Sequence, residues 1–344
     1  MADGLGRAEA CANIALAKYW GKSPRGGNLT AVPSLSLTLD NLRTRTEVRF
    51  SDDLAEDEAL LDGHPAGGRV LARIMELLDR LRASQGETRR AQVVSFNDFP
   101  TAAGLASSAS GFAALAMAAS RALAAPLDPM HLSSLARQSS ASAARSLFGG
   151  FVELGAETFS AMPVAPQDHW ELTMLVAVVE SGPKPVASTG GMIHTAATSP
   201  LYGAWVSAAP DIFAQVRRAV LERRFEDLAS AVEQSALTMH ATMLAARPPV
   251  VYFRGTTIEL IDQLPRWRLA GLPLAFTMDA GPNVKVLTPS EHAAELGQRL
   301  REFPGVGSVI ACRPGPAARL LELTGPLDTA SPLRDAGARD GEGP

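Results

Sequence analysis

Apolar and polar positions in the first part of the chain predict strands and one amphipathic helix. Ser34–Leu39 alternates polar and apolar side chains, which is typical of a half-buried strand. It follows another strand that begins near Cys11 and a loop at 21–28 rich in Gly, Lys and Pro. Between Val70 and Leu81 apolar residues recur at helical spacing with charged residues on the other side, so we expect an amphipathic helix there.

The middle of the chain predicts a short strand at 93–96, a loop of small residues and an alanine-rich helix that ends near Ala124. A second helix is expected to begin at Asp128 as its N-cap, with Pro129 at the first helical position, and to continue to about Arg145. The further elements expected are a buried strand at 172–179, helices at 211–223 and 225–245, a strand at 274–278, a helix at 291–302 and a strand at 308–312.

This order of strands and helices favours an α+β architecture, and a chain of 344 residues suggests two domains. We place an N-terminal domain at 1–182 and a C-terminal domain at 183–328, with the boundary in the turn after the apolar strand at 172–179. The last segment, 329–344, is rich in Gly, Asp, Arg and Pro, so we expect a disordered tail.

Composition and charge exclude several functions. The formal net charge is −4, with 20% charged and 46% hydrophobic residues, so no basic excess is present to hold a nucleic-acid backbone. No apolar run reaches the roughly 18 residues of a membrane span. Cys11 and Cys312 have no partner at metal-site or disulfide spacing, which favours a reducing cytoplasm. The six histidines also lack metal-ligand spacing.

The segment Pro100–Gly111 has one large side chain, Leu105, and stands where a loop enters a helix. Small residues let a backbone wrap around an anion, and amides at a helix N-terminus favour negative charge. Ser107 and Ser108 can add hydroxyls to a phosphate oxygen or to Mg²⁺. A helix start packed tightly against a sheet explains the same composition, and the Walker pattern is absent.

Two further segments carry cations beside small or hydroxylated residues. Asn13–Lys22 places two lysines and two aromatic residues where a strand enters a loop, either to neutralise phosphate or as a surface turn over Trp20. Ser140, Ser142 and Arg145 lie within two helical turns; they suit a phosphate and a carboxylate, or simply the end of an amphipathic helix.

Hydroxyls and one carboxylate stand at predicted turns of the second half. Lys184–Met192 follows a buried strand and carries Ser188 and Thr189, as an ordinary polar turn would. Phe276–Asn283 delivers Asp279 from a strand into a Gly-Pro-Asn turn, where an aspartate serves either as a catalytic group or as a turn cap.

Pro100–Ser108 resembles the ATP phosphate-binding motif of the GHMP kinase superfamily. Within it, the sequence Gly104-Leu-Ala-Ser-Ser108 resembles the form of this motif in the diphosphomevalonate decarboxylase branch. Asp279-Ala-Gly-Pro-Asn283 is similar to a signature of that branch, and the resemblance runs from Ala12 to about Pro316. It implies a two-domain GHMP kinase fold, with an N-terminal domain like domain 2 of ribosomal protein S5 and a ferredoxin-like C-terminal domain. It also implies a homodimer.

The resemblance implies ATP as co-substrate with Mg²⁺, and a role for each matching residue. Asp279 would be the catalytic carboxylate, Arg145 would hold the substrate carboxylate with Asn13 orienting it, and Lys18 and Ser108 would stabilise the transferring phosphoryl group. The ATP-binding residues would be Ala102, Ala103, Gly104, Leu105, Ala106, Ser107 and Ser108. The substrate-binding residues would be Tyr19, Trp20, Gly21, Lys22, Arg69, Ser140, Ser142, Ser188 and Thr189.

The reaction implied is ATP-dependent decarboxylation of a 5-diphosphorylated 3-hydroxy acid, diphosphomevalonate, to isopentenyl diphosphate, ADP, phosphate and CO₂. Two departures bear on specificity: Ser139-Ser-Ala-Ser142 replaces the family's Gly-Ser-Gly-Ser, and Ala187 replaces a serine. The alternatives are a relative acting on phosphomevalonate or mevalonate, including a kinase that stops at the 3-phosphate, and a non-catalytic nucleotide-binding protein.

Overall fold

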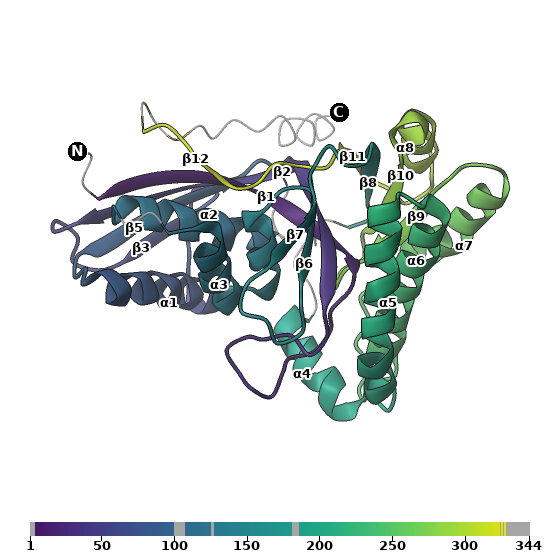
Figure 1. Cartoon of the computed structure of the whole chain (residues 1–344), viewed down its shortest axis with the longest axis horizontal. Helices are drawn as coiled ribbons and strands as arrows, with labels where there is room; N and C mark the ends of the chain where they lie inside the picture. The colour runs from purple at the N-terminus through teal and green to yellow at the C-terminus, as the bar shows by residue number, and fades with distance from the viewer. Residues whose placement is uncertain are drawn as a thin grey trace, which may run out of the picture.

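Two β-sheets organise the chain, which we describe from a computed structural model (Figure 1). The structure describes residues 4–99, 107–124, 127–180, 186–323, 325 and 327. The predicted tail at 329–344 lies outside these residues. Among the described residues, no helix combines the length and apolarity that crossing a lipid bilayer requires.

The first sheet has eight strands and is built on the long antiparallel pair β1 (Leu5–Ala17) and β2 (Ser34–Ser51). Its path is β12-β1-β2-β5-β3-β4, and β6 joins β2 and carries β7. The remaining strands are β3 (Glu58–Leu61), β4 (His64–Pro65), β5 (Arg90–Asn97), β6 (Phe151–Leu154), β7 (Met162–Ala165) and β12 (Arg319–Leu320).

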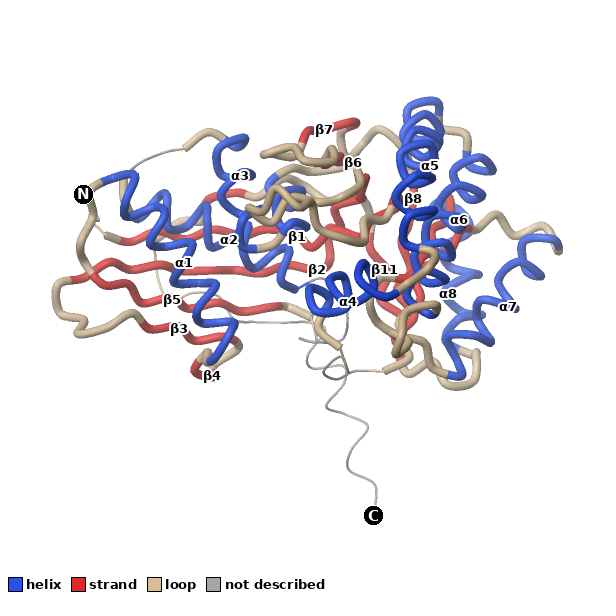
Figure 2. The backbone as a smooth tube through the Cα atoms, turned by 90° about the horizontal axis from the view of Figure 1, so that it is seen from below, coloured by secondary structure: helices blue, strands red, loops and turns tan. Residues whose placement is uncertain are grey.

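Three helices cover one face of the long strands: α1 (Gly68–Gln85), α2 (Ser107–Ala122) and α3 (Pro129–Ser139) (Figures 1 and 2). The alanines of α2 let it approach β1 closely. A Cβ at Gly6 would lie 2.1 Å from the carbonyl oxygen of Ala118, so only glycine fits there. Packing therefore fixes α2, and with it Ser107 and Ser108 in its first turn, against β1.

The second sheet has the order β11-β8-β10-β9, all antiparallel. Its strands are β8 (Leu172–Val178), β9 (Ala275–Met278), β10 (Val284–Pro289) and β11 (Ser308–Cys312). The helices of this half are α4 (Ser188–Thr198), α5 (Tyr202–Glu222), α6 (Phe225–Leu244), α7 (Gly255–Leu269) and α8 (Ala293–Arg301), with a 3₁₀ turn η2 (Ser290–His292) before α8.

One apolar core joins the two halves. Ile14 and Leu37 from the first sheet pack in the same buried cluster as Met174 of β8, Val216 of α5 and Leu228 of α6. The α+β fold class is confirmed. Among the described residues, β8 pairs only with strands of the second sheet. The division into domains at 182 and 183 stays a prediction.

The predicted helix from Asp128 to about Arg145 is wrong in its second half. Asp128 caps α3 as predicted, accepting from the backbone of Met130 and His131. The helix stops at Ser139, because Ser140 is extended, with φ −149° and ψ 118°, and a 3₁₀ helix η1 (Ala141–Leu147) follows. This break re-aims the serines and Arg145.

The expectation that Ser34–Leu39 is half-buried is also wrong, because both of its faces are buried. Its polar face meets polar groups: Ser34 and Ser36 accept hydrogen bonds from Arg145, and Thr38 donates to the carbonyl of Phe148. The hydroxyls in this strand therefore serve the arginine behind it.

Three helices of the second half were not predicted or were predicted too short. Ser188 and Thr189, expected in a turn, begin α4. The helix predicted at 211–223 starts earlier, at Tyr202, and continues through Pro210. α7 lies in a stretch for which no element was predicted.

Candidate active site

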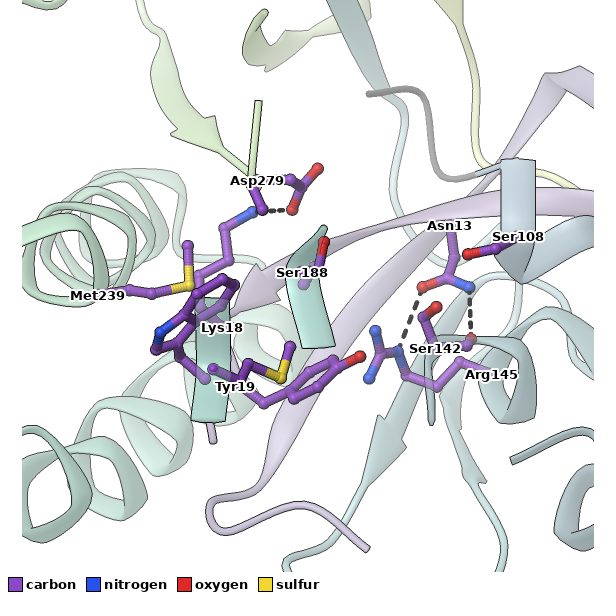
Figure 3. A pocket seen from close by; sticks show the side chains of 13 residues that line it. Asn13, Lys18, Tyr19, Ser108, Ser142, Arg145, Ser188, Met239 and Asp279 are labelled. Carbon is purple, nitrogen blue, oxygen red and sulfur yellow. Dashed lines mark hydrogen bonds and ion pairs between the residues drawn. The ribbon is translucent and has the colours of Figure 1, made fainter. Parts of the chain in front are cut away.

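A cavity opens where β1, the turn after β9 and the helices α2, α4 and α6 meet, between the two sheets (Figure 3). Nine of its lining residues are labelled in Figure 3, and they come from six separate stretches of the chain. The residues that line it are Asn13, Ala15, Lys18, Tyr19, Trp20, Ser108, Ser142, Arg145, Ser188, Met192, Met239, Asp279 and Ala280.

Lys18 and Asp279 form an ion pair across the cavity wall. The Lys18 ammonium donates to Asp279 Oδ1 at 2.6 Å (Figure 3). Burial lowers the pKa of Lys18 to about 8, although the charge and the hydrogen bond of Asp279 oppose that shift. Lys18 is therefore held charged by one carboxylate in a site that disfavours charge.

Asn13 and Arg145 meet on the other side of the cavity. β1 is irregular between Cys11 and Asn13, and such irregularities redirect side chains in a strand. The Nε of Arg145 donates to Asn13 Oδ1 at 3.2 Å and to Ser36 at 2.9 Å, while Nη1 donates to Ser34 at 2.5 Å. Asn13 in turn donates to Ser142 O and Ser146 Oγ, which ties the arginine to η1.

Arg145 is 1% exposed, yet none of these partners carries a negative charge. Burial is the main cause that lowers its pKa, and the more distant Asp279 only partly opposes this. Its second amino group, Nη2, makes no hydrogen bond to any residue within the described parts of the chain. A buried guanidinium in this state is stabilised by an anion.

Hydroxyl groups of serine and tyrosine lie close to the arginine. Ser140 and Ser142 are 3.2 Å apart at their oxygens, and Tyr19 bonds to Ser142. The Arg145 guanidinium lies 5.7 Å from the centre of the Tyr19 ring. Of the two serines only Ser142 lines the cavity; Ser140 lies behind it.

The remaining residues of the segment Tyr19–Lys22 take different places. Trp20 lines the cavity, and its carbonyl accepts from the indole of Trp205 at 2.9 Å. Gly21 has φ +117°, and a Cβ there would lie 2.0 Å from the Tyr202 hydroxyl, so a side chain is excluded. Lys22 bonds to Asn28 and lies over the Tyr19 ring, and burial lowers its pKa to about 8.

Some predicted residues do not line this cavity. Arg69 is exposed at the start of α1, and Thr189 is only half-buried. Ser107 lines a second cavity instead. The predicted ATP-binding residues Ala102, Ala103, Gly104, Leu105 and Ala106 lie outside the described residues.

The second cavity lies between α1, α2 and the strands β2 and β5, and shares Ser108 with the first. Its walls are mainly apolar, with one arginine and a few hydroxyl and amide groups. They comprise Thr44, Thr46, Leu61, Val70, Arg73, Ile74, Val93, Ser95, Asn97, Ser107, Ser108, Gly111, Phe112 and Leu115. Sequence reasoning missed this cavity, because its residues are dispersed over five elements.

Sequence reasoning also missed Lys285, whose ammonium lies 3.3 Å from Asp279 Oδ2. It missed the apolar lining by Met192 and Met239 as well. A lysine within a strand pattern does not by itself indicate a functional residue. The signal that could have identified Lys285 is its position two residues after the Asp279-Ala-Gly-Pro-Asn283 turn.

The described cavity therefore gathers cations around one carboxylate. Lys18, Lys285 and Arg145 lie at or beside its wall, Lys22 is close by, and Asp279 is the single acidic residue that lines it. Over the described residues no cluster of three or more His, Cys, Asp or Glu has metal-binding geometry. The arrangement suits a ligand with several negative charges.

Two family descriptions match most of the chain. Residues 10–163 match the diphosphomevalonate decarboxylase-like N-terminal domain, and residues 174–313 match the mevalonate 5-diphosphate decarboxylase C-terminal domain. Diphosphomevalonate decarboxylase of Candida albicans is 36% identical over 294 residues, covering 80% of this chain and 81% of the relative. The human diphosphomevalonate decarboxylase is 37% identical over 309 residues, covering 83% and 76%.

Solved structures of the same enzyme are similar over nearly the full chain. Mevalonate diphosphate decarboxylase of Staphylococcus aureus superposes with a TM-score of 0.86 at 36% identity, covering 93% of this chain and 98% of that one. A structure described as MDDEF in complex with MVAPP, AMPPCP and magnesium gives 0.85 at 38% identity, covering 93% and 99%.

Proposed function

The chain belongs to the diphosphomevalonate decarboxylase family and is an ATP-dependent decarboxylase of the mevalonate pathway, and we propose that the cavity between its two sheets is the reaction site. In this proposal the substrate is 5-diphosphomevalonate, and the products are isopentenyl diphosphate, ADP, phosphate and CO₂. We further propose that the enzyme works in the cytoplasm as a homodimer.

One observation carries this assignment: Arg145 is buried without an acidic partner in its hydrogen-bond shell, opposite the Lys18–Asp279 pair (Figure 3). A substrate carboxylate supplies the missing anion, and the fork of the guanidinium binds it in a fixed orientation. The buried arginine therefore favours a substrate that carries a carboxylate, which is the group that decarboxylation removes.

Asp279 is proposed to act on the 3-hydroxyl of the substrate. Its carboxylate accepts a hydrogen bond from the hydroxyl and orients or deprotonates it as the γ-phosphoryl group of ATP is transferred. The tertiary oxygen then leaves as phosphate, the C–C bond to the carboxylate breaks, and its electron pair forms the alkene. Arg145, held by Asn13, keeps that C–C bond aligned with the departing oxygen.

ATP is proposed to bind across the two cavities, with its triphosphate near Ser108, which lines both. The mainly apolar walls of the second cavity suit a nucleobase. The Ser108 hydroxyl and the phosphate oxygens form the kind of oxygen set that Mg²⁺ binds, and the residues present fit it. When bound, Mg²⁺ neutralises phosphate charge.

The substrate diphosphate is proposed to lie at the Tyr19–Ser142 side, near Lys22. The Ser140–Ser142 contact and the half-buried Lys22 give hydroxyl and ammonium donors for phosphate oxygens. Trp20, Gly21, Arg69, Ser188 and Thr189 are proposed to complete the substrate site, and 102–106 the phosphate loop. Ser139, Ala141 and Ala187 are positions at which this chain departs from the pattern that the resemblance implies.

Substrate selectivity tests this proposal. With ATP and Mg²⁺, we expect kcat/KM for 5-diphosphomevalonate to exceed that for the 5-phosphate and for mevalonate by at least about a hundredfold, because the second phosphate gains charge-assisted contacts of about 1.5–3 kcal/mol each. CO₂ release is measured for each substrate at equal concentration. A preference for the 5-phosphate would assign the chain to phosphomevalonate decarboxylation instead.

The nucleotide pocket gives a separate prediction. Val70 lines the second cavity and is 43% exposed, so Val70→Trp narrows the mouth without disturbing the core. We expect the KM for ATP to rise at least about fivefold, while the KM for diphosphomevalonate stays within about twofold. Val251→Trp is the matched control, because Val251 is 44% exposed and lines neither cavity. Equal KM values for ATP in both variants would place the nucleotide elsewhere.

A further inference from the structure

Lys285 stands inside the second sheet with an exposed fraction of 0%. In β10 its neighbours Val284 and Val286 face the apolar cluster under α7 and α8, so Lys285 points to the opposite face, toward the first sheet. A charge in this position is costly unless it is paired. Its ammonium lies 3.3 Å from Asp279 Oδ2 and donates to the carbonyl of Asn283 at 3.2 Å.

Lysine is rare in this chain, and its distribution is uneven. Only four of the 32 lysine and arginine residues are lysines: Lys18, Lys22, Lys184 and Lys285. Lys184 lies outside the described residues. The other three are all buried or half-buried, at or beside the cavity, whereas many of the arginines are exposed. A lysine places a compact point charge beside a single carboxylate oxygen, whereas a guanidinium binds through a broad planar fork.

Two lysines thus approach the Asp279 carboxylate, one at each oxygen. Lys18 reaches Oδ1 from β1, and Lys285 reaches Oδ2 from β10. Lys18 lines the cavity and Lys285 does not. Lys18 can therefore turn toward an incoming phosphoryl group, while Lys285 remains beside the carboxylate.

The groups that face Lys18 influence its charge, so the different positions of the two lysines matter. Asp279 faces it from the turn after β9, Lys285 from β10, Arg145 from η1 and His240 from α6. Burial lowers the pKa of His240 to about 3, so His240 is neutral near pH 7. Besides burial, the nearby cations Lys285 and Arg145 lower the pKa of Lys18, and Lys285 has the larger effect of the two.

We propose that Lys285 is a positioning residue for the reaction, which holds the Asp279 carboxylate in place and ion-paired when Lys18 engages the transferring phosphoryl group. This rests on the proposed function of Asp279. Lys285 touches neither substrate nor ATP in this arrangement, and it acts through Asp279 and through its charge near Lys18. Its loss therefore affects turnover more than binding.

The test measures kcat, both KM values and the pH profile of Lys285→Met, which removes the charge at similar volume. We expect kcat to fall about 10- to 100-fold, the order of one preorganised electrostatic contact, with both KM values within about threefold. Burial lowers the pKa of Lys18 to about 8, and the charge of Lys285 contributes to this shift, so loss of Lys285 should raise this pKa and move the alkaline limb of the pH profile to higher pH. Lys285→Gln, which keeps a donor for Asn283, is the second variant and should show the same loss.

Arg268→Met is the matched control. Arg268 forms an ion pair with the buried Glu233 at 2.5 Å in the same half of the chain. It does not line the candidate cavity, so Arg268→Met tests the effect of destabilisation alone. Two results together support the proposal. Arg268→Met keeps the wild-type alkaline limb, and adding Lys285→Met to Asp279→Asn lowers kcat further by less than about twofold. A soluble Lys285→Met or Lys285→Gln with wild-type kcat and alkaline limb overturns it. Failure of the wild type to release CO₂ would instead refute the proposed function.

Discussion

Replacing Asp279 with alanine is expected to remove most turnover while nucleotide and diphosphomevalonate still bind. The carboxylate contacts the reacting hydroxyl in the proposed mechanism, and loss of a general base or orienting group costs about 10²–10⁴ in rate. The cations that hold the substrate charges, Lys18, Lys22 and Arg145, remain in Asp279→Ala. Binding is measured by titration with a non-hydrolysable ATP analogue, and turnover by CO₂ release.

Asp279→Asn is the control for structure. The alanine variant leaves Lys18 and Lys285 without their shared carboxylate, which is destabilising, whereas asparagine keeps an oxygen for one of them. Both variants should be inactive, and the asparagine variant should melt at the higher temperature. Turnover above about a tenth of the wild-type rate in Asp279→Asn would rule out the proposed role, because catalysis of this kind contributes at least about a hundredfold.

The second large effect is expected at Arg145. Arg145→Leu removes the only group in the described cavity wall that is suited to bind the substrate carboxylate bidentately, so kcat should fall by about 10²–10³, or about 3–4 kcal/mol. ATP binding should change by less than about threefold, since Arg145 lines the first cavity but not the second. Arg145→Lys keeps the charge but loses the fork, and should recover only part of the rate.

Arg137→Leu separates this effect from loss of a buried arginine in general. Arg137 is 2% exposed and donates to the backbone carbonyls of Gly27 and Phe159, but it does not line the cavity. Its replacement should lower the melting temperature and leave the ratio of CO₂ to ADP unchanged. If Arg145→Leu also retains the wild-type kcat, the substrate carboxylate binds elsewhere.

Much of the fold and site could be predicted because local patterns there follow local physics. The N-cap Asp128, the helix at 70–81 and the strand before Asp279 appear as expected, since capping and periodicity act over a few residues. The structure also brings Asn13, Lys18, Arg145 and Asp279 to one cavity, as the resemblance implied. Their individual roles stay predictions.

The misses have a common cause, which is tertiary contact between distant segments. The alternation at Ser34–Leu39 indicates one exposed face, but Arg145 covers that face and uses its serines as acceptors. The same arginine belongs to the 3₁₀ helix that replaces the predicted end of α3. Lys285 lies within a strand, and its proposed role is recognised only from the structure, in which Asp279 lies between two lysines.

The most direct measurement is the ratio of products that the wild-type enzyme forms from 5-diphosphomevalonate with ATP and Mg²⁺. ADP, phosphate and CO₂ are recorded together in one time course. The account predicts equal release of all three, because phosphoryl transfer at the 3-hydroxyl leads to loss of both phosphate and the carboxylate held by Arg145. Formation of ADP without CO₂ would contradict it and make the protein a kinase.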